Sequence, residues 1–289
     1  MNKQRVRIVN IRLTLHKGDI VMSEYIANAG QTYFPVQENI NVDFVPFQHP
    51  AKPKPLLKPL ELTESYRKNG FILSSQKQHF LPGVTSEMMD WFWANLEKGY
   101  YLWAPGSHKR FSWVKAPSEV GMEQSVHMIA ESCAEGVPVF GGEGIEVHRL
   151  SLESFFPFTD CLAHVICEGV FNEKNELVDS TVHMWEDVPG GINHITATVT
   201  NTKCSEPPAF VKKLLAENPE VKMVPNYLTD HEDYEASQWP LFLPKLYELW
   251  KNHPDPSQNV HCCLKVERTE NGEFRYVSKN GPVCLEAQK

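Results

Sequence analysis

The chain has 289 residues, of which 42% are hydrophobic and 11% aromatic, and its formal net charge is −8. This acidic balance, without a basic stripe, argues against a nucleic-acid partner. No apolar run approaches the roughly 20 residues that a membrane-spanning helix needs, so we also expect no membrane partner. The seven cysteines include no CxxC pair, which indicates reduced thiols in a cytoplasmic protein. The length fits one large domain with a smaller appendage, as a monomer or a homodimer.

The first 84 residues carry few signals of a packed domain. Lys17-Gly18-Asp19 can be encoded by a purine-rich sequence of the ribosome-binding type, just upstream of the Met22 codon. Residues 1–21 are therefore either a non-native leader or an ordinary tail with a short alternating strand. Residues 46–59 contain five prolines, which exclude a helix or a central strand. We expect residues 22–84 to form an N-terminal arm and residues 85–289 the main domain.

The main domain is predicted to open with a helix over residues 86–98, capped by Ser86 and ended by Gly99. The aromatic run YYLW that follows favours a strand leading into a turn at Pro105-Gly106. His108 comes just past this turn. Because loops at the rim of a sheet present functional groups, His108 is a candidate to face a cavity.

The middle of the chain alternates between apolar and polar residues as strands do. The predicted strands cover residues 125–132, 145–155, 160–171, 179–188 and 192–200. In the first strand, alternation places His127, Ile129 and Glu131 on one face. An inward glutamate is costly unless it is paired or bound to a metal, although a Glu131 that faces solvent is an equally good interpretation.

Two predicted hairpins complete the sheet. The turn PGG joins the last two of these strands, and Asn271-Gly272 joins two C-terminal strands. A two- or four-residue loop at PGG would place His183 and His194 on the same sheet face, whereas a three-residue loop would separate them. Antiparallel strands with inserted helices predict an α+β fold, in which a curved sheet wraps a long helix and encloses a pocket.

The segment from residue 227 to residue 250 carries the most specific signal. Thr229 and Glu232 are spaced as a capping box, so a helix is expected to begin there. His231 and Glu235 are four residues apart, which puts both side chains on one face of that helix. This spacing suits two ligands of a metal ion, but it is also typical of a solvated acidic first turn.

The two prolines of this segment predict that its helix is broken. Pro240 and Pro244 should divide it into a ligand helix near residues 230–238 and a second helix near residues 241–251.

Four residues far apart in the sequence form a candidate zinc site: His108, Glu131, His231 and Glu235. Nitrogen and oxygen ligands without a thiolate are typical of a catalytic Zn²⁺ rather than a structural one. The sequence HEDYE resembles the HExxH motif of metalloproteases but ends in glutamate instead of histidine, which disfavours a protease.

Three motifs carry a family resemblance: YYLWAPGSH, VHMWEDVPGGINH and HEDYEASQWPLFLPKLY. In this order, over roughly residues 85–253, they resemble the 2,4-diacetylphloroglucinol hydrolase family, which includes phloretin hydrolases. The resemblance implies a Bet v 1-like helix-grip fold and a zinc ion. It also implies hydrolysis of the carbon–carbon bond between a phenolic ring and an acyl carbonyl.

The resemblance also assigns roles to individual residues. It makes His108, His231 and Glu235 zinc ligands, with Glu131 as the fourth ligand and Glu143 and Glu146 as alternatives. The catalytic residues it implies are His183 and His194, near the ring hydroxyls. For substrate binding it implies Tyr100 or Tyr101, and Phe111, which stands where a polar residue is expected.

From these residues we expect a retro-Claisen type of cleavage. The ring takes up a keto form with a histidine as proton carrier, and zinc polarises the acyl carbonyl. The expected substrate is a small polyphenolic ketone, with phloretin giving phloroglucinol and 3-(4-hydroxyphenyl)propionate. The alternatives are diacetylphloroglucinol as the substrate, or a non-catalytic carrier of hydrophobic ligands on the same fold.

Overall fold

A computed structural model of the chain describes residues 32–33, 58–131, 140–217, 227–252, 260–262, 264–271, 274–278 and 285–287. The leader or tail predicted at residues 1–21 lies outside these ranges, as does most of the predicted arm.

One antiparallel sheet of seven strands dominates the described chain, in the order β2-β8-β7-β6-β5-β4-β3. Its strands are β2 (Phe71–Pro82), β3 (His108–Lys115), β4 (Val126–Glu131), β5 (Phe140–Leu150), β6 (His164–Phe171), β7 (Leu177–Val188) and β8 (Gly191–Asn201). The short strands β1 (Thr32–Tyr33), β9 (Val260–Cys262), β10 (Leu264–Arg268), β11 (Phe274–Ser278) and β12 (Leu285–Ala287) form two small sheets.

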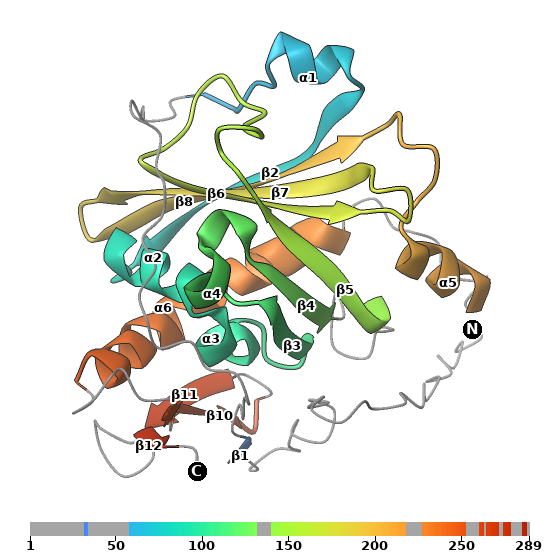
Figure 1. The fold of residues 1–289 in the computed structure, drawn as a ribbon. Helices are drawn as coiled ribbons and strands as arrows, with labels where there is room; N and C mark the ends of the chain where they lie inside the picture. The colour runs from blue at the N-terminus through green and yellow to red at the C-terminus, as the bar shows by residue number, and fades with distance from the viewer. Residues whose placement is uncertain are drawn as a thin grey trace, which may run out of the picture.

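The helices gather mainly on the concave side of this sheet (Figure 1). They are α1 (Glu64–Lys68), α2 (Ser86–Ala94), α3 (Leu96–Trp103), α4 (Pro117–Val120), the 3-10 helix η2 (Met122–Gln124), α5 (Ala209–Glu217) and α6 (Tyr227–Lys251). The long helix α6 packs against β2, α2 and α3. Buried aromatic and aliphatic side chains, among them Phe92, Trp93, Trp239 and Phe242, form the core between these helices and the sheet. The predicted helix-grip fold is confirmed.

Helix α6 differs from its prediction in two ways. It begins at Tyr227, so Thr229 lies inside the helix and the predicted capping box is wrong. Pro240 and Pro244 also lie inside a single helix of 25 residues, so the predicted break is wrong. A proline in a helix interior costs about 3 kcal/mol. Burial of the large apolar side chains beside these prolines, such as that of Phe242, offsets this cost.

The predicted strand at YYLW is instead helix α3. The predicted helix over residues 86–98 is two helices, α2 and α3, and the cap of α2 is Thr85 rather than Ser86. Gly99 lies within α3 and does not end a helix. A Cβ atom at Gly99 would come within 2.7 Å of the Phe92 ring, so glycine is required there for close packing. Burial of the aromatic side chains against α6 overrides their preference for strands.

The sheet begins earlier in the chain than expected. Strand β2 pairs with β8 from Phe71↔Asn201 to Pro82↔Gly191. The boundary predicted between residues 84 and 85 therefore falls after the first strand of the grip.

The predicted C-terminal hairpin is confirmed by the antiparallel pairing of β10 with β11.

The C-terminal hairpin is anchored to the grip through Tyr276. Its hydroxyl lies 2.6 Å from the carbonyl oxygen of Leu102 and 2.9 Å from Gln238 Oε1.

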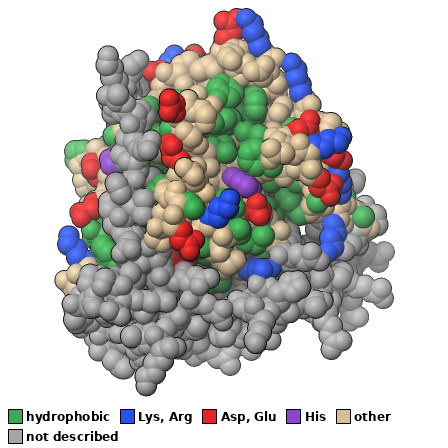
Figure 2. Space-filling model, viewed as in Figure 1, with side chains coloured by type: hydrophobic (Ala, Val, Ile, Leu, Met, Phe, Trp, Pro, Cys, Tyr) green, Lys and Arg blue, Asp and Glu red, His purple; other side chains and the backbone are tan. Residues whose placement is uncertain are grey.

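On the described surface, Figure 2 shows acidic and basic side chains interspersed around an apolar area of one face.

Candidate metal centre and cavity

Three side chains from distant parts of the chain meet below the sheet. Helix α6 supplies His231 and Glu235, one turn apart, and His108 is the first residue of β3. Glu235 Oε1 lies 3.0 Å from His108 Nε2 and 3.2 Å from His231 Nε2. One ligand atom from each of the three lies within 4.8 Å of the others. All three residues are buried.

The hydrogen bonding of this cluster requires a shared proton or a metal ion. His108 Nδ1 lies 2.6 Å from the carbonyl oxygen of Tyr100, which can only accept, so Nδ1 carries the proton. In a neutral ring the Nε2 lone pair then points at the Glu235 carboxylate, and two acceptors face each other. His231 also has two buried ring nitrogens without a well-formed hydrogen bond to any described residue. This donor set therefore fits a divalent metal ion.

Without an ion, the side chains compensate one another through protonation. Burial alone would raise the pKa of Glu235, but the neighbouring His231 and His108 outweigh it and lower that pKa to about 2. Burial likewise opposes the charged form of His231, yet the Glu235 carboxylate raises its pKa to about 9. The cluster thus attracts positive charge, whether a proton or a metal ion.

Glu131 lies at the edge of this cluster. It pairs with His108 across β3 and β4, and its Oε2 lies 3.5 Å from His108 Nε2 and 3.9 Å from His231 Nε2. The same oxygen accepts a hydrogen bond of 2.9 Å from the Tyr100 hydroxyl. Glu131 is thus within reach of a shared ion.

Glu143 and Glu146 were the alternatives to Glu131 as the fourth ligand. The Glu146 side chain is 47% exposed and pairs with His148 at 2.7 Å, so Glu146 cannot be a ligand in this arrangement. The side chain of Glu143 lies outside the described part of the structure.

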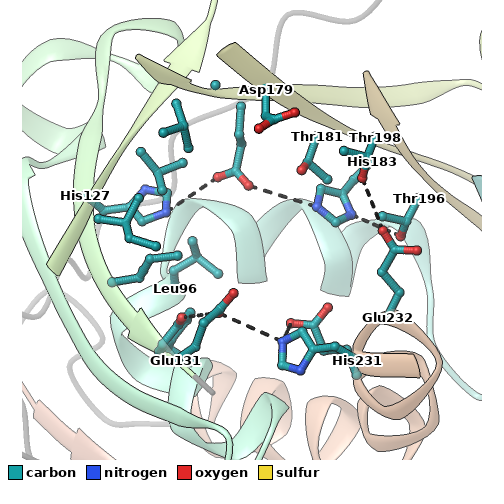
Figure 3. Close-up of a pocket in the computed structure, with 18 of the residues that line it drawn as sticks. Leu96, His127, Glu131, Asp179, Thr181, His183, Thr196, Thr198, His231 and Glu232 are labelled. Carbon is teal, nitrogen blue, oxygen red and sulfur yellow. Dashed lines mark hydrogen bonds and ion pairs between the residues drawn. The ribbon is translucent and has the colours of Figure 1, made fainter. Parts of the chain in front are cut away.

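A cavity of about 200 Å³ opens beside the cluster, between the sheet and the helices. Tyr100, Trp93 and Trp103 contribute aromatic walls, and Glu131, His231 and Glu235 lie at one end. Figure 3 shows Glu131 and His231 on one side of this space and His127 and His183 on the opposite side. A space of this kind suits a small aromatic molecule.

Only one of the three predicted substrate-binding residues lines the cavity. Tyr100 does, and its ring stacks on His108 with centroids 4.0 Å apart. Burial and the Glu131 carboxylate raise the pKa of Tyr100 well above its usual value, so its hydroxyl stays protonated. Tyr101 and Phe111 lie behind this wall, where the Phe111 N–H donates to the Tyr101 hydroxyl at 3.3 Å. Phe111 does not line the cavity, and its role in substrate binding stays a prediction.

The hairpin between β7 and β8 brings His183 and His194 together. Val188 pairs with Gly191, which leaves a two-residue loop, and the two rings lie on the same face with centroids 5.6 Å apart. Only His183 lines the cavity. His194 lies behind it and packs edge-on against Trp239 at 4.7 Å, so it does not line the cavity, and its catalytic role stays a prediction. Burial lowers the pKa of His183 to about 3, so that ring is neutral near pH 7.

Three further carboxylates line the cavity and were missed, those of Glu168, Asp179 and Glu232. Glu232, predicted to be a cap, is buried and accepts hydrogen bonds from Thr198 at 3.3 Å and Ser75 at 3.4 Å. Burial and the nearby Glu235 raise the pKa of Glu232 to about 7. Glu168 lies in β6 and lines the same cavity. The signal for Glu168 was available, because it is a lone charge inside the apolar run HVICEGVF.

The fold and the site together define a helix-grip protein whose buried histidine–carboxylate cluster can hold a metal ion beside a small-molecule cavity. The chain belongs to the family described as DAPG hydrolase PhiG domain, which matches residues 66–248. Membership supports, at the level of the family, a hydrolase of acylphloroglucinols, of which DAPG, 2,4-diacetylphloroglucinol, is one. No curated protein sequence matches the chain significantly.

Solved structures with a similar outline have low sequence identity. Protein Ms6760 from Mycobacterium smegmatis is 11% identical, over 65% of this chain and 97% of that one, with a TM-score of 0.33. Ginseng major latex-like protein 151 from Panax ginseng is 11% identical, over 59% and 97%, with a TM-score of 0.32. Norcoclaurine synthase from Thalictrum flavum is 10% identical, over 56% and 91%, with a TM-score of 0.30. These scores are too low to support an argument about function.

Among the described helices, none combines the length and the apolar character that a membrane span requires.

Proposed function

We propose that this protein is a zinc-dependent hydrolase that cleaves the bond between an acyl carbonyl and the ring of an acylphloroglucinol, with phloretin as its substrate. The observation that carries the proposal is the convergence of His108, His231 and Glu235 at one end of an aromatic cavity. Family membership supports the reaction class.

The proposed metal ligands are His108, His231 and Glu235, with Glu131 as the fourth. When bound, the ion would supply Lewis acidity toward the acyl carbonyl. Two histidines and two carboxylates balance the charge of Zn²⁺, and a donor set without thiolates is more typical of a catalytic zinc site than of a structural one. The hydrogen bond from the Tyr100 hydroxyl orients Glu131.

The remaining residues of the cavity would hold the ring and move its protons. Trp93 and Trp103 offer flat surfaces for an aromatic ring and exclude water from it. His183, neutral in its buried position, is the proposed proton carrier for conversion of the phenol to its keto form. In the overall reaction the ring–acyl bond breaks, water gives its hydroxyl to the acyl carbon, and a proton goes to the ring carbon.

Phloretin is preferred over diacetylphloroglucinol because of the aromatic character of the cavity. Trp93, Tyr100, Trp103 and Phe210 all line it, and a second aromatic ring in the substrate would pack against such walls.

The experiment that tests the proposal is product analysis after incubation with a panel of acylphloroglucinols, with and without a chelator. Stoichiometric zinc, turnover of phloretin and loss of turnover in His231→Ala support it. Metal-free protein that binds the same compounds without turnover would show a hydrophobic-ligand carrier instead.

We also propose a cytoplasmic location. Cys167 and Cys204 are free thiols, as expected in a reducing compartment. Formation of a homodimer stays a prediction, to be tested by light scattering.

A further inference from the structure

Glu168 is a carboxylate in the cavity wall that the reaction described above does not use. It is 9% exposed, and its Oε1 lies 3.1 Å from Nη1 of the buried Arg149. The Arg149 guanidinium in turn lies over the Trp93 ring, 5.0 Å from its centroid. Arg149 thus compensates the charge of Glu168 and fixes its position from behind the wall.

Apart from the ion pair with Arg149, this carboxylate has room for a further donor. That ion pair does not have the geometry of a hydrogen bond, and His127 Nε2 is 3.7 Å from Oε1. Oε2 has His183 Nε2 at 4.0 Å, which is too far for a direct hydrogen bond. A single oxygen atom about 2.8 Å from both atoms would bridge this gap.

The surroundings favour an aromatic hydroxyl as the source of that oxygen. His183 packs on the Trp93 ring at 4.5 Å, so an aromatic wall borders the gap. His127 and His183 both point into the cavity in Figure 3. Burial lowers the pKa of both histidines, so their rings are neutral near pH 7. Burial also raises the pKa of Glu168, and the neighbouring Arg149 opposes that shift. The carboxylate paired with Arg149 is therefore the acceptor that faces the space.

We propose that Glu168 is a specificity-determining residue, whose carboxylate accepts a hydrogen bond from a ring hydroxyl of the substrate, with that oxygen between Glu168 and His183. This inference rests on the proposed function and narrows its substrate class to rings that carry a free hydroxyl at this position. A ring without one leaves the buried carboxylate without a donor, and a site built to hydrogen-bond a hydroxyl rejects such an analogue.

The test measures binding of two small rings to the zinc-loaded protein by calorimetry. Phloroglucinol carries three hydroxyl donors, and 1,3,5-trifluorobenzene has a similar outline without donors. The variants are Glu168→Gln and, as the matched control, Glu146→Gln, which makes the same change on an exposed side chain of the same sheet. We expect Glu168→Gln to weaken phloroglucinol binding about tenfold or more, since a hydrogen bond to a charged carboxylate is stronger than one to a neutral amide. The affinity of Glu168→Gln for trifluorobenzene should equal that of the wild type, and Glu146→Gln should bind both rings as the wild type does.

Equal affinity of wild type and Glu168→Gln for phloroglucinol would overturn the inference. Should Glu168→Gln fail to fold because Arg149 loses its partner, the double variant Arg149→Met/Glu168→Gln removes both charges and should show the same loss. Turnover of acylphloroglucinols by the wild type separates failure of the proposed function from failure of the role of Glu168. If the wild type turns over its substrate and Glu168→Gln binds phloroglucinol as tightly as the wild type, only the role of Glu168 fails. If the wild type neither turns over acylphloroglucinols nor binds phloroglucinol, the proposed function fails and this inference fails with it.

Discussion

Glu235 Oε1 lies 3.0 Å from His108 Nε2, although the two residues are 127 positions apart in the chain. His108 already donates from Nδ1 to a backbone carbonyl, so a neutral His108 ring cannot donate to Glu235 as well. The contact therefore calls for a proton or a metal ion between these atoms, and it connects the start of β3 to the middle of α6.

Removing the Glu235 carboxylate should weaken metal binding strongly. Glu235→Ala is expected to lower zinc affinity by more than about a hundredfold, because loss of a direct ligand exceeds the 10–100-fold effect of losing a supporting hydrogen bond. Zinc content by mass spectrometry and affinity by chelator competition measure this. Glu146→Gln should keep the full zinc content; an unchanged zinc affinity in Glu235→Ala would place the metal elsewhere.

The Tyr100 hydroxyl should matter for turnover rather than for folding. Tyr100→Phe deletes the 2.9 Å hydrogen bond to Glu131 but keeps the stacking on His108. We expect kcat/KM for the acylphloroglucinol to fall about 10–100-fold, with little change in the melting temperature. Steady-state kinetics and thermal unfolding test this, and wild-type kinetics in Tyr100→Phe would exclude a role for the hydroxyl.

The buried His194 should make stability depend on pH. Burial lowers its pKa well below 6.5 in the folded protein, so the unfolded chain takes up the proton first as pH falls. The contribution of His194 to the unfolding free energy is then fully present above about pH 6.5. Below that pH it declines by about 1.4 kcal/mol per pH unit.

The variant His194→Gln isolates that contribution. It removes the titrating group. The slope of unfolding free energy against pH, between about pH 6 and pH 4.5, should therefore become shallower by the amount that corresponds to about one bound proton. Urea unfolding at several pH values gives this slope, whatever the packing loss does to stability at neutral pH. An identical slope in both proteins would show that His194 is protonated in the folded state.

Tyr276 should anchor the C-terminal hairpin to the grip. Tyr276→Phe removes a buried hydroxyl beside Leu102 and Gln238, and we expect a loss of about 1–2 kcal/mol in unfolding free energy. Tyr66→Phe is the matched control, because that hydroxyl makes a longer, exposed contact of 3.4 Å with Ser154. Equal effects of the two substitutions would argue against a specific anchor.

Local patterns in the sequence predicted much of this structure. Alternation located the strands that carry His127, Glu131 and His183, because side chains in a strand point to opposite faces in turn. Helical spacing placed His231 and Glu235 together, because residues four apart share a helix face. Both rules depend only on backbone geometry over a few residues.

Other features depended on what packs against each segment. The aromatic run at residues 100–103 has the propensity of a strand, yet it is helical because its rings fill the core beside α6. Pro240 and Pro244 remain within one helix because the core holds that helix together. Similarly, Phe111 and His194 are displaced from the cavity by the residues in front of them.

By itself, then, the sequence predicted a curved antiparallel sheet wrapped on a long helix and a candidate set of metal ligands, since these follow from short-range periodicity and ligand chemistry. The helix-grip fold itself was implied by the family resemblance. Only the tertiary structure decided which groups share the cavity, such as Glu168 with Arg149 behind it, and which lie one layer back. That selection depends on contacts between strands and helices distant in the chain, where burial and charge compensation act over a few ångströms rather than a few residues.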